Sequence, residues 1–287
     1  MQFLLRVIAG LPLPWVHRLG AMAGWVTYMA SPTYRRRLRA NLAQALGAMP
    51  RGVLRAAVAE AGRQALELPW VLIRPRREVL AQVMDVQGQE WVDRARAAGR
   101  GVLFLTPHLG CFEITAQYLA QQAPITVLYR PPRKEALRPV IEGGRTKGMM
   151  RIAPADLSGV RKLVQALRKG EAVGMLPDQV PSQGEGQWAP FFDRPAWTMT
   201  LAARLSEVKN TETLCIWAQR LPRGTGYCIR IAPPESPLVG SLEERVVRIN
   251  QEMERMIRAC PAQYLWGYNR YKRPSGVERP VGEAAPS

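Results

Sequence analysis

Two residues with catalytic potential stand five positions apart near the middle of the chain, His108 and Glu113, in the segment TPHLGCFE at 106–113. The apolar run 101–105 before it predicts a buried strand, and 114–120 after it predicts a helix. On one continuous helix, residues five apart are rotated by roughly 140° and do not face each other. A strand-to-helix turn at His108 would instead let Glu113 reach its ring. The pattern therefore predicts a histidine base held by an orienting carboxylate, which can take a proton from an alcohol.

Other roles are open for the residues of this turn. A single histidine is often a core residue or a hydrogen-bonded group near a helix start, although the position at a strand end and the nearby glutamate favour a base for His108. Cys111 is a rival nucleophile, because a helix N-terminus can lower the pKa of a thiol. A small core residue is the more common fate of such a cysteine.

Polar residues also follow other predicted strands. Asp178 and Gln179 follow the apolar run 172–176 after Pro177, and Arg145 lies in a basic segment beyond the strand predicted at 125–130. The carboxyl ends of parallel strands meet at one edge of a sheet, so we expect these side chains to build a single site with His108. A turn or helix-cap role is the alternative for Asp178.

The order of apolar segments predicts an α/β fold with a mixed, mostly parallel central sheet flanked by helices. Strands alternate with helices up to about residue 176, and the runs 214–219 and 227–232 predict an antiparallel pair. Helices are expected at 157–169, 196–207 and 242–260, and a Gly-rich aromatic loop at 184–192.

The chain of 287 residues carries a net charge of +17 and has a pI near 10.6. Such a field attracts polyanions, including nucleic acid, anionic lipid, phosphorylated substrates and acidic carrier proteins. A basic nucleic-acid-binding protein is the non-enzyme alternative, but no nucleic-acid motif or interleaved aromatic platform supports it. Four cysteines without a CxxC pair and two histidines argue against a zinc site or a disulfide framework and favour a reduced, cytosol-facing location.

Residues 1–33 form an apolar segment interrupted by Arg6, Pro12 and Arg18, so no run reaches the roughly 18 to 20 apolar residues of a spanning helix. We expect an amphipathic, membrane-contacting segment, with the basic cluster 35–39 held at an anionic surface. A helical hairpin packed on the domain is the alternative. Residues 34–272 are expected to form the α/β domain, and 273–287 a disordered tail.

The chain resembles a known family, the late lauroyl/myristoyl acyltransferases of lipid A biosynthesis. They belong to the wider glycerolipid acyltransferase group, marked by His-x4-Asp/Glu. The resemblance runs from about residue 35 to 271 and rests on TPHLGCFE, YRP at 129–131, GRTKG at 144–148, LPDQ at 176–179, PFF at 190–192 and Asn41-Leu42. Family members often carry a second acidic residue after the Asp-Gln pair, where this chain has Val180.

The resemblance implies acyl transfer from an acyl carrier protein thioester to a hydroxyl of a phosphorylated lipid A precursor, without a cofactor or metal. His108 would be the general base and Glu113 would fix its tautomer. Arg145 would stabilise an oxyanion or anchor a phosphate. Asp178, Gln179 and Arg130 would bind substrate. It further implies a bacterial inner membrane location with the catalytic domain facing the cytoplasm. A lysophospholipid or another glycolipid is the alternative acceptor.

Two further sets of residues are assigned on the same basis. Candidates for the acyl groove are Trp188, Phe191 and Phe192, with core packing as the alternative for at least one of them. Candidates for contact with the acidic carrier or the lipid phosphates are Arg130, Arg133, Lys134, Arg138 and Lys147, any of which could instead be solvated surface charge.

Overall fold

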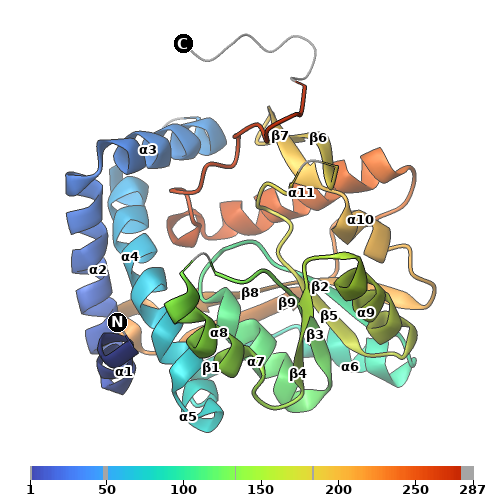
Figure 1. The fold of residues 1–287 in the computed structure, drawn as a ribbon, viewed down its shortest axis with the longest axis horizontal. Coiled ribbons are helices and arrows are strands. Elements are labelled where there is room, and N and C mark those ends of the chain that lie inside the picture. Colours follow the sequence, from blue (N-terminus) through green and yellow to red (C-terminus); the bar gives the residue numbers. More distant parts are fainter. Residues whose placement is uncertain (1, 48–50, 133, 183, 279–287) are drawn as a thin grey trace.

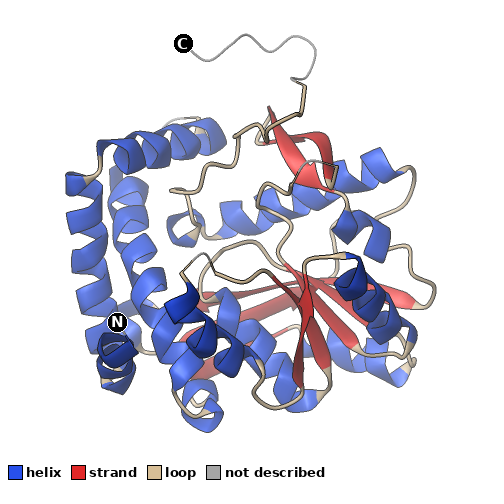
Figure 2. Ribbon diagram, viewed as in Figure 1, coloured by secondary structure: helices blue, strands red, loops and turns tan. Residues whose placement is uncertain are grey.

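A computed structural model describes residues 2–47, 51–132, 134–182 and 184–278 (Figures 1 and 2). The described strands are β1 Val83–Gln87, β2 Gly101–Leu105, β3 Ile125–Tyr129, β4 Met150–Pro154, β5 Ala172–Met175, β6 Gly186–Phe191, β7 Arg194–Met199, β8 Thr211–Arg220 and β9 Tyr227–Ala232. The described α-helices are α1 Gln2–Gly10, α2 Leu13–Ala30, α3 Pro32–Leu46, α4 Arg51–Ile73, α5 Arg76–Leu80, α6 Gln89–Ala97, α7 Phe112–Gln122, α8 Arg138–Arg145, α9 Leu157–Arg168, α10 Leu201–Leu205 and α11 Leu242–Ala259. Short 3₁₀ turns lie at Glu135–Leu137, Pro222–Gly224 and Pro261–Gln263.

The central sheet of the described chain has the strand order β1-β9-β8-β2-β5-β3-β4. The strands from β8 to β4 run parallel to one another, whereas β9 is antiparallel to β8 and β1 is parallel to β9. Helices lie on both sides of this sheet (Figure 2). The prediction of an α/β fold with a mixed, mostly parallel sheet is therefore confirmed.

Two long helices begin and end close to where the sequence predicts, and side-chain caps fix where each of them begins. The Asp156 side chain accepts a hydrogen bond from the Gly159 amide at the start of α9. Ser241 and Glu244 form a reciprocal capping box at the start of α11. Such caps satisfy amide groups that a helix leaves unpaired at its N-terminus.

The segment 184–207 is not the loop and helix that the sequence suggests. β6 and β7 form an antiparallel hairpin in which Trp188 lies opposite Trp197, and only α10 in this segment is helical. The chain reverses at Phe192 and Asp193, whose φ angles are 48° and 60°. Left-handed turns of this kind usually contain Gly or Asn, so the residue types at this turn gave no hairpin signal.

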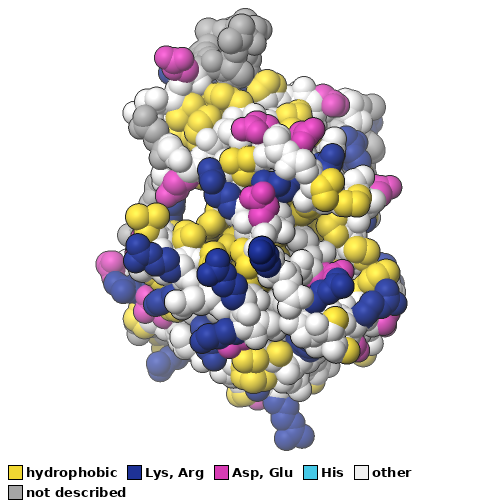
Figure 3. All heavy atoms as spheres, turned by 90° about the vertical axis from the view of Figure 1, so that its right-hand side faces the viewer, with side chains coloured by type: hydrophobic (Ala, Val, Ile, Leu, Met, Phe, Trp, Pro, Cys, Tyr) yellow, Lys and Arg dark blue, Asp and Glu magenta, His cyan; other side chains and the backbone are white. Residues whose placement is uncertain are grey.

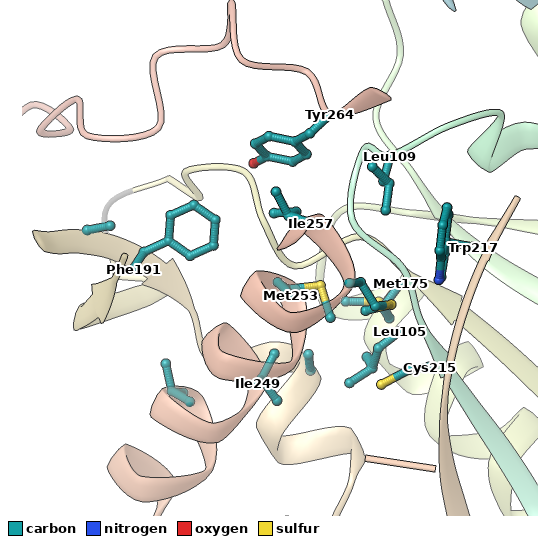
Figure 4. Close-up of a cluster of buried hydrophobic side chains, with 14 of the residues drawn as sticks. Leu105, Leu109, Met175, Phe191, Cys215, Trp217, Ile249, Met253, Ile257 and Tyr264 are labelled. Carbon is teal, nitrogen blue, oxygen red and sulfur yellow. The ribbon is translucent and has the colours of Figure 1, made fainter. Parts of the chain in front are cut away.

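α11 packs over one face of the sheet and covers the strands that lead to the predicted site. Leu105 of β2 and Met175 of β5 lie beside Met253 and Ile257 of α11 in a buried cluster (Figure 4). Burying an aliphatic side chain of this size contributes about 1.5 to 3 kcal/mol. This cluster therefore holds β2 and β5 side by side just before both strands end.

At the N-terminus, α2 and α4 pack as an antiparallel helical pair beside the sheet (Figure 1). Gly20 and Gly24 of α2 face Gly62 of α4 so closely that a Cβ at any of the three would collide with backbone of the other helix. The segment therefore packs on the domain, as one of the two alternatives expected. Among the helices that the structure describes, none has the length and apolar character needed to cross a membrane.

The predicted disordered tail begins at Arg273, and its part at 279–287 lies outside the described residues. The residues just before position 279 are packed on the β6–β7 hairpin. Val277 is buried, and the Trp188 indole N–H donates a hydrogen bond of 2.8 Å to the Glu278 carbonyl oxygen.

Candidate active site

His108 is held by Asp178 through two hydrogen bonds. The His108 backbone amide donates to Asp178 Oδ2 at 2.9 Å, and the ring Nδ1 lies 2.8 Å from Asp178 Oδ1. An ionised carboxylate only accepts hydrogen bonds, so Nδ1 carries the proton in this pair. The other ring nitrogen, Nε2, is then the basic one.

The register of the sheet explains why these two residues meet. β2 and β5 are adjacent parallel strands in which Leu105 pairs with Met175. His108 and Asp178 each lie three residues beyond that pair, so both leave the sheet at the same edge. The expected convergence of side chains at the carboxyl ends of the strands is confirmed for this pair.

Asp178 is an anion in a buried position, with 1% of its surface exposed. Burial alone would raise the pKa of its carboxyl group, but the charge and hydrogen bonds of His108 outweigh burial and lower that pKa below its ordinary value. A buried carboxylate that stays ionised stabilises a positive charge on the imidazole. Asp178 can therefore fix the ring tautomer and also favour the imidazolium that forms when Nε2 takes a proton.

Gln179 lies on the other side of the ring. Its amide nitrogen is 3.1 Å from His108 Nε2, which agrees with Nε2 acting as an acceptor. The side chain of His108 is 17% exposed, so Nε2 lies near the surface of a pocket rather than in the core. The Phe112 ring contacts the His108 ring edge to face, with 4.9 Å between the two ring centres, and limits its rotation.

Glu113 does not hydrogen bond to the histidine ring. Its carboxylate pairs with Arg145, the last residue of α8: Nε donates to Oε2 at 3.1 Å and Nη2 donates to Oε1. The prediction that Glu113 orients the ring is therefore corrected, and Asp178 has that role. The reason is the position of α8, which brings a guanidinium to Glu113 in the first turn of α7.

The guanidinium of Arg145 is itself confined. Burial would lower the pKa of Arg145, but the Glu113 charge and hydrogen bond raise it, so the group stays cationic. Its guanidinium carbon also lies 5.8 Å from the centre of the Tyr129 ring. The sequence placed Arg145 in the same site as His108. In the structure Arg145 lies beside Glu113, on the wall of a different cavity from the one that His108 lines.

The backbone of the His108 turn is clamped by two neighbouring segments. The Gly110 amide donates to Gln263 O at 3.1 Å, and the Leu265 amide donates to His108 O at 3.1 Å. Gly110 has φ of +57°, and a Cβ there would collide with the Ala218 carbonyl oxygen. Glycine is therefore required at this position both for the left-handed backbone and for the close approach of β8.

A buried ionic network supports the same turn, and sequence reasoning missed it. Arg220 of β8 donates from Nη2 to Gly110 O at 2.7 Å and also pairs with Glu67 and Glu60 of α4. Glu67 additionally lies 3.2 Å from His17 Nε2 of α2. Burial would raise the pKa of Glu67, but Arg220 and His17 lower it to about 2. Nothing in the sequence pairs residues so far apart.

Two cavities border the site on opposite sides of Phe112 and Glu113, which line both. The first, of about 50 Å³, lies between α7 and the sheet and has Arg145 on its wall. The second, of about 190 Å³, lies between α4 and the His108 turn, and we call it the α4 cavity. Its walls are one face of α4 (Ala61, Gln64, Ala65, Glu67, Leu68 and Val71), the turn from His108 through Glu113 except Leu109, and Leu265.

Cys111 is poorly suited to be a nucleophile. It is buried, and burial raises the pKa of its thiol well above the ordinary value, with the Glu67 charge acting in the same direction. The reactive form of a cysteine is the thiolate, which this environment disfavours. The structure therefore favours the core role for Cys111.

The other predicted site residues are spread around this edge. Arg130 follows β3 and is exposed, with its guanidinium 3.3 Å from Ser182 Oγ. Lys147 is anchored to the fold, because its Nζ donates to the carbonyl oxygens of Leu72 and Arg74 at the end of α4, at 2.6 Å each. Arg138 is exposed and pairs with Glu142, Lys134 is exposed, and Arg133 lies outside the described residues.

The aromatic candidates for the acyl groove pack mainly in the core. Phe191 and Phe192 are 2% and 1% exposed, and the Phe192 ring contacts Trp266. Trp188 is half-buried and meets Trp197 edge to face across the β6–β7 hairpin. Core packing thus replaces the groove prediction for the two phenylalanines. In the part of the chain that the structure describes, no cluster of three His, Cys, Asp or Glu side chains could hold a metal ion.

Comparisons with known proteins show the family of the chain. The family model for bacterial lipid A biosynthesis acyltransferases matches residues 1–273. The lipid A biosynthesis lauroyltransferase of Escherichia coli (strain K12) is 27% identical over 282 residues, which are 95% of this chain and 90% of that protein. The palmitoleoyltransferase of the same organism is 29% identical over 204 residues, 70% of this chain and 64% of that protein. The myristoyltransferase of that organism is 24% identical over 185 residues, which are 64% of this chain and 57% of that protein.

The chain therefore belongs to the bacterial lipid A biosynthesis acyltransferase family. The resemblance that the motifs carry is confirmed at the level of the family.

Proposed function

We propose that the protein transfers a fatty acyl chain from an acyl carrier protein thioester to a hydroxyl group of a lipid A precursor. The observation that carries this proposal is the His108–Asp178 pair, in which Nδ1 is fixed on a buried carboxylate and Nε2 faces a pocket. A hydroxyl oxygen becomes a good nucleophile only when a base takes its proton, and this pair is built to do so. Family membership supplies the acyl transfer and the lipid acceptor.

The reaction proceeds in two steps at His108. In the first, Nε2 accepts the proton of the acceptor hydroxyl while its oxygen forms a bond to the thioester carbonyl carbon, and Asp178 stabilises the imidazolium. In the second, the carbon–sulfur bond breaks and the leaving thiolate takes the proton back from Nε2. General-base help of this kind contributes about a hundred- to ten-thousand-fold in rate. The Gln179 amide contacts His108 Nε2 in this structure, so it must move aside when the acceptor hydroxyl binds.

Arg145 provides a positive charge next to the site that a bound anionic group can use. Its guanidinium lies against Glu113, on the wall of the cavity that Phe112 separates from His108. Glu113 acts in this scheme by holding Arg145 rather than by holding the ring. Stabilisation of the developing oxyanion is one use of the cation, and binding of an acceptor phosphate is the other.

An acidic carrier protein fits the distribution of charge. Figure 3 shows the face at the right of Figure 1, where α9 lies. Lys and Arg side chains spread over the lower half of this face. The exposed basic residues of α9 are Arg161, Lys162 and Arg168, and the exposed Lys169 follows directly after the helix. Such a field speeds the approach of an acidic partner and weakens as salt rises. Arg130 extends the positive charge to the edge of the site.

The N-terminal helices support attachment to the bacterial inner membrane from the cytoplasmic side. The face of α2 opposite α4 exposes an apolar stripe that recurs at alternating intervals of four and three residues, and Met22 at its centre is 64% exposed. The stripe comprises Trp15, Leu19, Met22, Val26 and Met29. On α1, Phe3, Leu4 and Val7 are exposed as well. An apolar helix face flanked by arginines binds the headgroup level of an anionic bilayer.

The proposal is tested by an in vitro transfer assay with acyl carrier protein thioesters of several chain lengths. The acceptors are a tetraacylated lipid A precursor with and without Kdo sugars, a lysophospholipid and an unrelated glycolipid. We expect acylated product with the lipid A precursor. Product with the lysophospholipid or glycolipid alone would identify a different acceptor. Absence of product with every pair, from folded protein in detergent, would overturn the proposal.

A further inference from the structure

The α4 cavity contains a polar group that has no partner. Gln64 is 9% exposed, and its amide nitrogen Nε2 has no hydrogen-bond partner among the described residues. Leaving a buried donor unpaired is costly, and in native proteins such a group is usually completed by an ordered water, an ion or a ligand. The donor lines the same cavity as His108 and Glu113, so a group bound there would lie beside the His108 turn.

The other polar side chains of this cavity are already committed. Both carboxylate oxygens of Glu67 accept from Arg220, those of Glu113 accept from Arg145, and His108 is held between Asp178 and Gln179. Most of the remaining wall is apolar, with Leu68, Val71, Phe112 and Leu265 among its residues. Small side chains, Ala61 and Ala65, leave space on α4. A single free donor in a mostly apolar wall suits a hydrocarbon chain that carries one oxygen function.

We propose that the α4 cavity binds an acyl-chain segment bearing a carbonyl or hydroxyl oxygen, and that the Gln64 amide donates to that oxygen. This inference rests on the proposed function and extends it, because it assigns a place and a polar contact to one of the two lipid chains. Both the thioester donor and a 3-hydroxyacyl acceptor carry the required oxygen. The donor offers a carbonyl, and the acceptor offers a hydroxyl close to a carbonyl.

The experiment measures binding of two neutral probes, methyl decanoate and methyl 3-hydroxydecanoate, to the full-length protein in detergent, by titration calorimetry. The variants are Gln64→Met, which removes the donor with little change in volume, and Ala65→Leu, which fills the cavity at its exposed rim. The controls are Gln121→Met on α7 and Ala97→Leu at the end of α6, both exposed and away from the cavity.

We expect Ala65→Leu to weaken both probes by at least tenfold and Gln64→Met to weaken binding about 3- to 10-fold, the value of one neutral hydrogen bond. An effect of Gln64→Met on the hydroxy ester alone identifies the acceptor chain. An equal effect on both esters identifies a carbonyl contact. No binding to the wild type, or Kd values of both variants within twofold of the controls, would overturn the inference.

Steady-state kinetics provide the second readout. With donor and acceptor varied in turn, Gln64→Met should raise the KM of one substrate about 3- to 10-fold and leave that of the other within twofold. Unchanged KM values for both substrates would count against the inference. Ester binding needs no turnover, so the binding result can be interpreted even if the transfer reaction fails. The experiments therefore distinguish failure of the proposed function from failure of the inference about the α4 cavity.

Discussion

Replacing Asp178 with asparagine keeps the shape of the side chain but changes what it can offer His108. The carboxylate accepts from both the backbone amide and Nδ1 of His108. An asparagine has one acceptor and one NH₂ donor. If the oxygen faces the backbone amide, the NH₂ group faces Nδ1 and forces the proton onto Nε2, which removes the base. In the other orientation the NH₂ group opposes the backbone amide, and the buried contact is lost.

The first orientation removes the base, and both orientations remove the negative charge that stabilises the imidazolium, so most of the general-base contribution is lost. We therefore expect kcat of Asp178→Asn to fall about a hundred- to ten-thousand-fold, equivalent to about 3 to 5 kcal/mol in the barrier, with a smaller change in KM. His108 and Asp178 act as one unit, so the double variant Asp178→Asn/His108→Ala should be no slower than His108→Ala.

The assay is acyl transfer under saturating donor, with folding checked by thermal midpoint. Asp156→Asn, which alters a carboxylate that caps α9, is the matched control, because asparagine caps a helix as well as aspartate does. A rate within threefold of the wild type for Asp178→Asn would refute the role given to this carboxylate. A double variant much slower than His108→Ala would show that Asp178 acts on something else.

Three further outcomes follow from the structure. Cys111→Ala should retain transfer activity within about threefold, since the buried thiol takes no part in the chemistry, and a loss of a hundredfold would revive the cysteine nucleophile. The pKa of Glu67 is lowered to about 2 from its ordinary 4.5, so its ionic contribution, about 3 kcal/mol, is complete above pH 4.5 and is lost as pH falls towards 2. Urea unfolding at pH 7, 4.5 and 3 should therefore show the stability gap between wild type and Glu67→Gln shrinking below pH 4.5, and a gap independent of pH would contradict the buried ion pair. Met22→Glu should weaken sedimentation with anionic liposomes about tenfold or more. The control Met84→Glu, which alters a similarly exposed methionine on β1, should leave sedimentation unchanged. Equal effects of the two variants would count against the α2 stripe as the membrane face.

The parts of the fold that the sequence predicts well are those set by local pattern. The apolar runs before His108 and Asp178 give β2 and β5 within one residue of their observed ends. The rule that ligands bind at the carboxyl ends of parallel strands then brings both residues into one site. The same reasoning could have paired His108 with Asp178, because each lies at the same distance beyond its strand, but the adjacency of β2 and β5 is not written in either segment.

The parts that were mistaken or missed depend on tertiary placement. The spacing of His108 and Glu113 suggested that they pair, whereas the position of α8 decides that Glu113 pairs with Arg145. Arg220 supports the His108 turn through contacts with residues more than a hundred positions away, which no periodicity reveals. Figure 1 shows the reason, since α4 runs beside the sheet and meets β8 only in the folded chain.

The most direct test of the central claim is the single-turnover rate of acyl transfer in wild type and His108→Ala, with acyl carrier protein thioester and lipid A precursor both bound. We expect a loss of at least a hundredfold in the chemical step, with donor and acceptor affinities changed by less than about threefold. A His108→Ala variant that transfers the acyl chain at close to the wild-type rate would contradict the assignment of His108 as the base.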